Sequence, residues 1–173
     1  MKLVSFRVAS FQSVLDSGQV DVGDITCLVG KNEAGKSALL KALYRLNPIR
    51  PEDRNYSVID DYPRLEVTDY EHSVQNDERE PAVVVETLYE LDDEEVAEVE
   101  KQFGPRFFRD RTLVLSKNYA NSRGYLLNVR EDEAIKFLAR NLDDELQTEA
   151  TAAKNANALA DVLEPHASEP AVT

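Results

Sequence analysis

The chain has 173 residues, which is enough for one ordinary domain with a hydrophobic core but too short for two large domains. Its hydrophobic content of 42% and charged content of 31% are typical of a soluble globular protein and exclude a chain that is disordered throughout. No apolar run approaches the length of a membrane span, and the first residues lack the form of a signal peptide, so we expect a cytoplasmic protein with no membrane partner.

The net charge of −13 is unevenly distributed along the chain. Residues 1–50 carry a net charge of +3, residues 51–100 carry −15, and residues 101–173 carry −1. This distribution excludes a uniformly basic nucleic-acid surface, so we expect any phosphate-binding surface in the N-terminal part. The acidic segment is expected to be a solvated surface; a face that binds a partner or mimics nucleic acid is the alternative.

Cysteine and histidine are too sparse for the common metal sites. Cys27 is the single cysteine, so internal disulfides and cysteine-based metal clusters are excluded, and we expect its side chain to fill the core. His72 and His166 have no companions at ligand spacing. No nucleophile and base stand in an arrangement for hydrolase chemistry, so we assign no catalytic residue.

In chain order, the first elements predicted are strands and a helix. "KLVSFRV" alternates as a strand does, and "GQVDVGD" predicts a short strand or turn. "ITCLV", residues 25–29, is apolar on both faces and predicts a covered central strand of an α/β fold. From Gly35 to about Leu46, leucines at helical spacing predict a helix, which Asn47 and Pro48 end.

The middle of the chain predicts a loop followed by an antiparallel sheet. Residues 47–80 show no sustained period and predict a long irregular loop. "PAVVVETLYEL" predicts a strand, and Asp92, Glu95 and Gly104 delimit a helix that follows it directly. "RTLVLSKNY" and "RGYLLNV" predict two further strands, joined by a turn at "ANS", that complete the sheet.

The C-terminal part predicts a helix and a tail. Apolar residues at Ile135, Leu138, Leu142 and Leu146 begin an amphipathic helix that an alanine-rich stretch continues to about Leu163. A packed terminal helix is favoured over a coiled-coil arm because alanines occupy the later positions. We therefore expect a lobe over 1–130 that includes a β subdomain over about 81–130, a helical segment over 131–163, and a disordered tail over 164–173.

The stretch "GKNEAGKS" matches the G-x-x-x-x-G-K-[ST] phosphate-binding loop between a predicted strand and a predicted helix. Backbone N–H groups of such a loop and the helix N-terminus converge on phosphate oxygens. Lys36 would neutralise the outer phosphates, and the Ser37 hydroxyl would contact Mg²⁺. We expect the residues that bind ATP to be Gly30, Lys31, Asn32, Glu33, Ala34, Gly35, Lys36, Ser37 and Ala38, with Ser37 also at the metal.

The N-terminal 50 residues resemble the start of the ABC-type ATPases of the SMC, RecF and OLD (overcoming lysogenization defect) clan, also called AAA-family ATPases. "CLVGKNEAGKSALLKALYRLNP" is most similar to OLD-family ATPases. The resemblance implies an α/β P-loop NTPase fold, the N-terminal lobe of an ABC-type head with an antiparallel β subdomain. It also implies ATP and Mg²⁺ as ligands, head association as a homodimer or with a C-terminal ATPase lobe, and a role in DNA processing or phage defence.

The other motifs of that clan do not stand out in the sequence. "TLYELDD" is the nearest imitation of an acidic Walker B strand, but a helix cap at Asp92 is the favoured interpretation. No signature loop is found. We therefore expect a chain that binds ATP and, alone, does not hydrolyse it efficiently.

Two other functions stay open from the sequence. One is a small P-loop kinase, and the other is a non-catalytic acidic interaction module with a vestigial loop. Within "DDYPR", a proline turn with a solvated arginine is favoured, with a contact of Tyr62 or Arg64 to nucleotide or partner as the alternative. Gln75 is a weak candidate for the metal-contacting glutamine of ABC-type folds.

Overall fold

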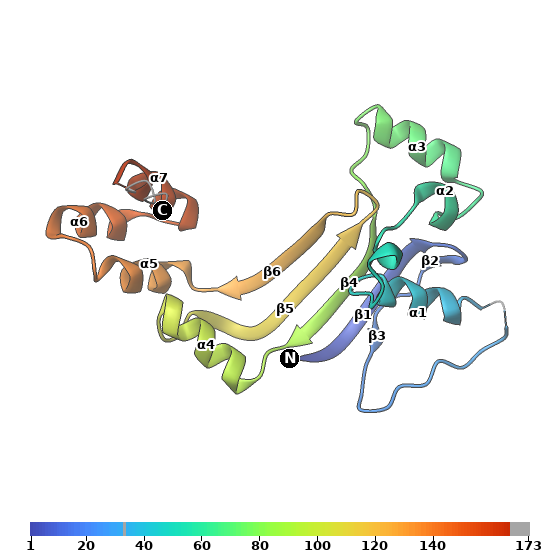
Figure 1. Cartoon of the computed structure of the whole chain (residues 1–173), viewed down its shortest axis with the longest axis horizontal. Helices are drawn as coiled ribbons and strands as arrows, with labels where there is room; N and C mark the ends of the chain where they lie inside the picture. The colour runs from blue at the N-terminus through green and yellow to red at the C-terminus, as the bar shows by residue number, and fades with distance from the viewer. Residues whose placement is uncertain (33, 167–173) are drawn as a thin grey trace. The chain divides into compact units, whose positions relative to one another are not determined.

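Antiparallel strands form the sheet of the computed structural model, which describes residues 1–32 and 34–166 (Figure 1). The strands are β1 (Lys2–Phe11), β2 (Val14–Asp16), β3 (Val20–Asp21), β4 (Val83–Glu90), β5 (Phe108–Asn118) and β6 (Arg123–Val129). They lie in the order β2, β1, β4, β5, β6, with β3 also paired to β1. None of the described helices is long and apolar enough to cross a membrane.

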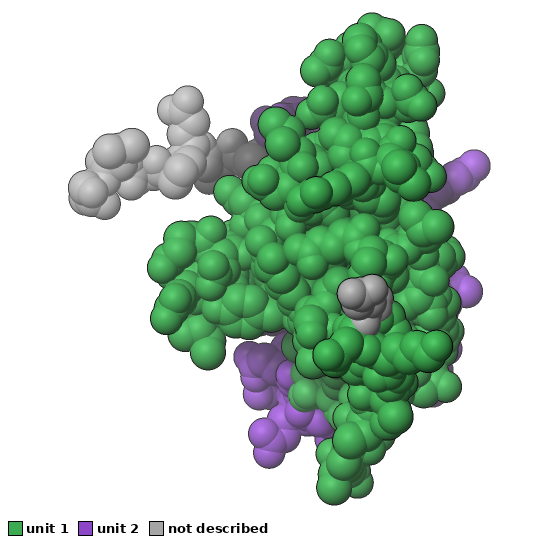
Figure 2. Space-filling view, turned by 90° about the vertical axis from the view of Figure 1, so that its right-hand side faces the viewer, with its two compact units in different colours: residues 1–90, 112–126 green, residues 91–111, 127–173 purple. Residues whose placement is uncertain are grey.

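The chain forms two compact units, which Figure 2 shows in different colours. The first unit comprises residues 1–90 and 112–126, and the second comprises residues 91–111 and the chain from residue 127 onward. Residues 91–111 thus group with the C-terminal helices, although the sequence analysis grouped them with the β region. The domain division at residue 130 stays a prediction.

Strand β1 is central to the first unit because it pairs with three strands. It runs antiparallel to β4 with Phe6 opposite Thr87 and Val8 opposite Val85, and these four side chains are buried. Burial alternates from Phe6 to Val8 and from Val85 to Thr87, but the pairing shifts register near Leu3 and near Val83, and Val84 is buried beside Val85. The predicted strands of "KLVSFRV" and "PAVVVETLYEL" are confirmed.

Helix α1 (Lys36–Tyr44) packs on this sheet and confirms the helix predicted after Gly35. Ala38, Ala42 and Leu46 are buried, and their small or branched side chains let the helix lie close to strands β1 and β4. Aromatic side chains complete the core of the first unit, namely Phe6, Phe11, Tyr56, Tyr62, Tyr70 and Tyr119.

Residues 47–80 are not one irregular loop, so that prediction is wrong. They form the 3₁₀-helix η1 (Pro51–Arg54) and the helices α2 (Val58–Asp61) and α3 (Val67–Gln75). Ser57 caps α2 by accepting a hydrogen bond from the N–H of Asp60. The rings of Tyr62 and Tyr70 stack with centroids 4.1 Å apart, so burial of two large side chains orders a polar stretch that has no helical period.

The central strand predicted over residues 25–29 is also wrong. Ile25 and Val29 are each 92% exposed, and Cys27 is exposed, so its predicted place in the core is wrong as well. A strand needs hydrogen-bonding neighbours, and no strand among the described residues pairs with this segment. A largely apolar segment, exposed except for the half-buried Leu28, therefore lies directly before the phosphate-binding motif.

The second unit begins with helix α4 (Asp93–Phe103), which is confirmed with the predicted cap. The side chain of Asp92 accepts hydrogen bonds from the N–H groups of Glu94 and Glu95, and the Glu95 carboxylate accepts from the N–H of Asp92. Gly104 ends the helix with a φ of 98°. The predicted strands after it are confirmed as β5 and β6.

The segment 131–163 is not one continuous helix. It forms α5 (Glu131–Ala139), α6 (Asp144–Ala152) and α7 (Ala156–Leu163), which share a small core. Asp143 and Asn155 each cap the N-terminus of the helix that follows, so the chain ends one helix and begins another at these positions. The predicted tail begins with the 3₁₀-helix η2 (Glu164–His166), and its residues 167–173 lie outside the described residues.

Replacing Gly104 tests the contact between the end of α4 and α5. A Cβ at this position would lie 2.6 Å from Cγ of Phe137, so Gly104→Ala combines a positive φ with a clash. We expect a loss of about 3 kcal/mol in the free energy of unfolding of the second unit. Gly18→Ala is the control, because Gly18 has a φ of 62° with nothing within 4 Å, and should cost about 1 kcal/mol. Equal losses in urea unfolding would contradict the clash.

Lys117 on β5 is a cation enclosed in the core of the first unit. It is 1% exposed, and its ammonium donates hydrogen bonds to the carbonyl oxygens of Arg45 and Arg54. The ammonium also lies 4.9 Å from the ring centroid of Tyr56. Burial, followed by the charges of Arg123, Arg54 and Arg45, lowers the pKa of Lys117 from 10.5 to about 8.

This pKa gives stability a defined pH dependence. Between pH 8 and 10.5 the unfolded chain holds a proton on this lysine that the folded chain releases. The contribution of Lys117 to the free energy of unfolding therefore increases as the pH rises through that range. We expect urea unfolding to show the wild type gaining stability relative to Lys117→Met from pH 8 to 10.5. A constant or falling difference would contradict a lowered pKa.

Candidate functional site

The phosphate-binding motif lies where an irregular loop enters helix α1. Gly35 is the N-cap of α1 with φ 84° and ψ 6°, in the left-handed region that favours glycine. No side chain caps this helix N-terminus, and the first intrahelical bond runs from the N–H of Leu39 to the carbonyl of Gly35 at 2.9 Å. The N–H groups of Lys36, Ser37 and Ala38 thus have no intrahelical acceptor.

Gly35 also lies in close contact with the turn that follows β1. A Cβ on Gly35 would lie 2.8 Å from Cγ2 of Val14 and 3.3 Å from Oγ of Ser13. Any larger residue would have to move the loop away from this turn. The second glycine of the motif is therefore required by both its backbone angle and its packing.

Lys36 folds back over the loop that precedes it. Its ammonium donates hydrogen bonds to the carbonyl oxygens of Gly30 at 2.7 Å and Lys31 at 2.5 Å. The N–H of Ala34 donates to the carbonyl of Lys31 at 3.1 Å, which closes the turn within the loop. A positive charge is thus held at the loop, next to the uncapped N-terminus of α1, where an anion is stabilised by both.

The donors of this loop match the chemistry of a nucleotide with Mg²⁺. The N–H groups that have no intrahelical acceptor, together with the Lys36 ammonium, are the donors that phosphate oxygens require. The side chain of Ser37 is exposed and carries the kind of oxygen that Mg²⁺ prefers. The described residues hold no cluster of three or more His, Cys, Asp or Glu side chains that could bind a metal.

The predicted binding residues occupy one continuous stretch, Gly30 to Ala38. Asn32 and Lys31 are exposed in the loop, whereas Ala38 is buried and packs α1 on the core. Glu33 lies outside the described residues. The assignment of these residues to ATP stays a prediction.

The other candidate residues of the sequence lie elsewhere. Asp92 caps α4, so the favoured interpretation of "TLYELDD", a helix cap at Asp92 in place of a Walker B acid, is confirmed. Tyr62 is buried in the aromatic core and Arg64 is exposed. Gln75 is the last residue of α3 and lines a pocket with Tyr70 and Tyr119 that includes none of the loop residues.

Sequence analysis missed the residues that support the loop, Ser13 and Val14. No local pattern marks them, because their role follows from a tertiary contact with Gly35. Asp61 was also missed, although it lies in the "DDYPR" stretch, because nothing in the sequence shows that its carboxylate is buried.

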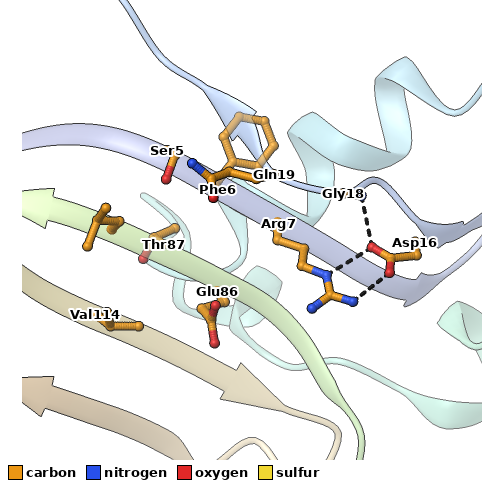
Figure 3. Close-up of a pocket in the computed structure, with 10 residues that line it drawn as sticks. Ser5, Phe6, Arg7, Asp16, Gly18, Gln19, Glu86, Thr87 and Val114 are labelled. Atoms are coloured by element: carbon orange, nitrogen blue, oxygen red, sulfur yellow. Dashed lines mark hydrogen bonds and ion pairs between the residues drawn. The ribbon is translucent and has the colours of Figure 1, made fainter.

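A separate pocket of about 420 Å³ lies on the first unit (Figure 3). Arg7 donates two hydrogen bonds to Asp16, at 2.9 and 2.5 Å, and the N–H of Gly18 donates to the same carboxylate at 2.9 Å. The bonds from Arg7, followed by the one from Gly18, lower the pKa of Asp16 to about 2. Because the guanidinium of Arg7 is already paired with a carboxylate, this pocket is a poorer anion site than the loop.

Comparison with known sequences decides the family. The profile of the AAA ATPase domain matches residues 1–168, almost the whole chain. The chain belongs to the AAA ATPase domain family. Comparison with curated proteins finds no match. Membership in the AAA ATPase domain family supports a P-loop NTPase with a nucleotide-binding, ATPase-like function, in agreement with the loop geometry.

Two glycine variants test whether the packing of Gly35, and not of Gly30, contributes to stability. Gly35→Ala should lower the free energy of unfolding by about 2 kcal/mol, because it adds a clash to a positive φ. Gly30→Ala should change it by less than about 0.5 kcal/mol, because its Cβ would only touch Cβ of Ala34 at 3.5 Å. Urea unfolding measures both, and equal losses would contradict the packing described for Gly35.

Proposed function

We propose that this chain is the ATP-binding lobe of an ATPase head of the OLD, SMC and RecF type. The observation that carries the proposal is the uncapped N-terminus of α1, where Gly35 is in the left-handed region and the Lys36 ammonium lies on the loop carbonyls. The family match over residues 1–168 supports the same function.

In this proposal the residues from Gly30 to Ala38 bind ATP. The N–H groups at the start of α1 bind phosphate oxygens, and Lys36 exchanges its bonds to the loop carbonyls for bonds to the outer phosphates. Ser37 binds Mg²⁺, which supplies positive charge between the outer phosphates. The packing of Gly35 on Ser13 and Val14 holds these donors in place before the nucleotide arrives.

Hydrolysis in this proposal needs a second ATPase element, from a C-terminal lobe or from another copy of the chain. Asp92, the nearest candidate for a Walker B acid, is occupied as a helix cap. The exposed apolar segment 25–29 supports the proposal that a partner binds here, because apolar segments of this kind form stable strands when neighbouring elements cover them. Nucleotide-dependent association of heads in the cytoplasm, coupled to DNA processing or phage defence, follows from the resemblance to that clan.

Titration calorimetry with Mg²⁺-ATP tests the binding site. We expect saturable binding by the wild type and a dissociation constant at least about tenfold higher for Lys36→Ala, because a charge-assisted contact to phosphate is lost. Lys41→Ala is the matched control, since Lys41 is an exposed lysine of the same helix and lies outside the motif. It should bind as the wild type does.

The same samples test the division between binding and hydrolysis. Phosphate release by the isolated chain should stay at background. Wild-type protein that binds no Mg²⁺-ATP, or equal effects of the Lys36 and Lys41 variants, would contradict the proposed site. Transfer of phosphate to a small molecule would instead favour a kinase.

A further inference from the structure

Asp61 is a carboxylate buried in the core of the first unit. Its side chain is 2% exposed, and it lies in the "DDYPR" stretch that the ATP site does not use. The N–H of Ser57 donates to its Oδ2 at 3.0 Å, which fixes the carboxylate within the short helix α2. A buried carboxylate is costly unless it is paired, so its partners show what it positions.

One partner is the turn that supports the phosphate-binding loop. The backbone N–H of Gln12 donates to the carbonyl oxygen of Asp61 at 2.5 Å, and the Gln12 side-chain amide lies 3.4 Å from Oδ1. Gln12 has a φ of 53°, in the left-handed region that favours glycine and disfavours other residues. The next two residues, Ser13 and Val14, are those that contact Gly35.

The other partner is the far end of the helix that begins at this loop. Arg45, the C-cap of α1, donates to Oδ2 of Asp61 and, at 3.2 Å, to the carbonyl of Asn55. The guanidinium of Arg45 also lies 5.8 Å from the ring centroid of Phe11. Asp61 therefore connects the turn under Gly35 with the C-terminal end of α1.

We propose that Asp61 is a positioning residue for the phosphate-binding loop, acting through Gln12 on the turn under Gly35 and through Arg45 on helix α1. Among the described residues, its hydrogen bonds go to Gln12, Arg45 and Ser57 and to none of the residues of the loop. Its backbone carbonyl accepts from the N–H of Gln12, next to Ser13 and Val14, and its carboxylate binds Arg45. It thus connects the turn to helix α1 and keeps the donors of the loop in place. The effect on ATP affinity rests on the proposed function; the effect on loop order does not.

Hydrogen exchange and nucleotide binding by Asp61→Asn test this inference. The variant keeps the shape of the side chain and removes the charge that binds Arg45. At a temperature where it is fully folded, we expect amides 30–39 to exchange at least about tenfold faster and the dissociation constant for Mg²⁺-ATP to rise about tenfold. Thr87→Val is the control, because Thr87 is a buried polar residue that bonds to the carbonyl of Leu115, away from the loop.

A second pair of variants covers the case in which Asp61→Asn fails to fold. Gln12→Gly removes the amide and allows a positive φ, whereas Gln12→Val removes the amide and disfavours that φ. We expect Gln12→Val to repeat the faster exchange at 30–39 and the weaker binding. Gln12→Gly should stay within about twofold of the wild type.

The outcomes separate this inference from the proposed function. Faster loop exchange in Asp61→Asn and Gln12→Val, with Thr87→Val and Gln12→Gly unchanged, supports a positioning role. Equal exchange in all variants, or equal acceleration by Thr87→Val, overturns it. If the wild type binds no Mg²⁺-ATP, the proposed function fails, and loop exchange alone decides the role of Asp61.

Discussion

The contact of Gly35 with the turn after β1 is the constraint on which the site depends. It places the start of α1 against Ser13 and Val14, and only glycine satisfies both the backbone angle and the distance. The helix therefore begins at Lys36 with an uncapped N-terminus, and Lys36 folds its ammonium back onto the loop. The partial positive charge of the helix and the positive charge of Lys36 thus lie together at the N-terminus of α1, although the chain as a whole is strongly acidic.

The core of the first unit holds the phosphate-binding loop and the start of α1 in position. Strand β1 brings the turn to the loop, helix α1 packs its small residues on the sheet, and the aromatic side chains fill the space between. Buried polar groups connect these parts, because Lys117 donates to the carbonyls of Arg45 at the end of α1 and of Arg54 in η1, and Arg45 donates to Asp61. Such groups stabilise the fold only when every partner is in place, so they also specify one arrangement of helix and turn. The position of the loop thus depends on residues far from the motif in sequence.

Local patterns made part of this structure predictable. The capping box of Asp92 and Glu95 and the alternation in β1 and β4 depend on residues close together in the chain, and these elements are confirmed. The strand predicted over residues 25–29 is wrong because an apolar run favours burial but does not show which elements would cover it. Ser57, three residues before Asp60, was a signal that could have placed helix α2. The burial of Asp61 has no such signal, since Arg45 and Gln12 reach it only in the folded chain.

The segment 25–29 is exposed, whereas the loop that follows it is well formed. In the proposed function, nucleotide binding and hydrolysis therefore have different structural requirements. The start of α1 has the N–H donors and the lysine that the proposed phosphate site requires, and in the proposed function the exposed segment 25–29 is covered by a further ATPase element. The central claim is that nucleotide binds at the start of α1. The most direct measurement is hydrogen exchange of the wild type with and without Mg²⁺-ATP. The account predicts protection concentrated in residues 30–39 and unchanged exchange in the helices over 131–163. Unchanged exchange at 30–39 in the presence of saturating Mg²⁺-ATP, or protection centred elsewhere, would contradict it.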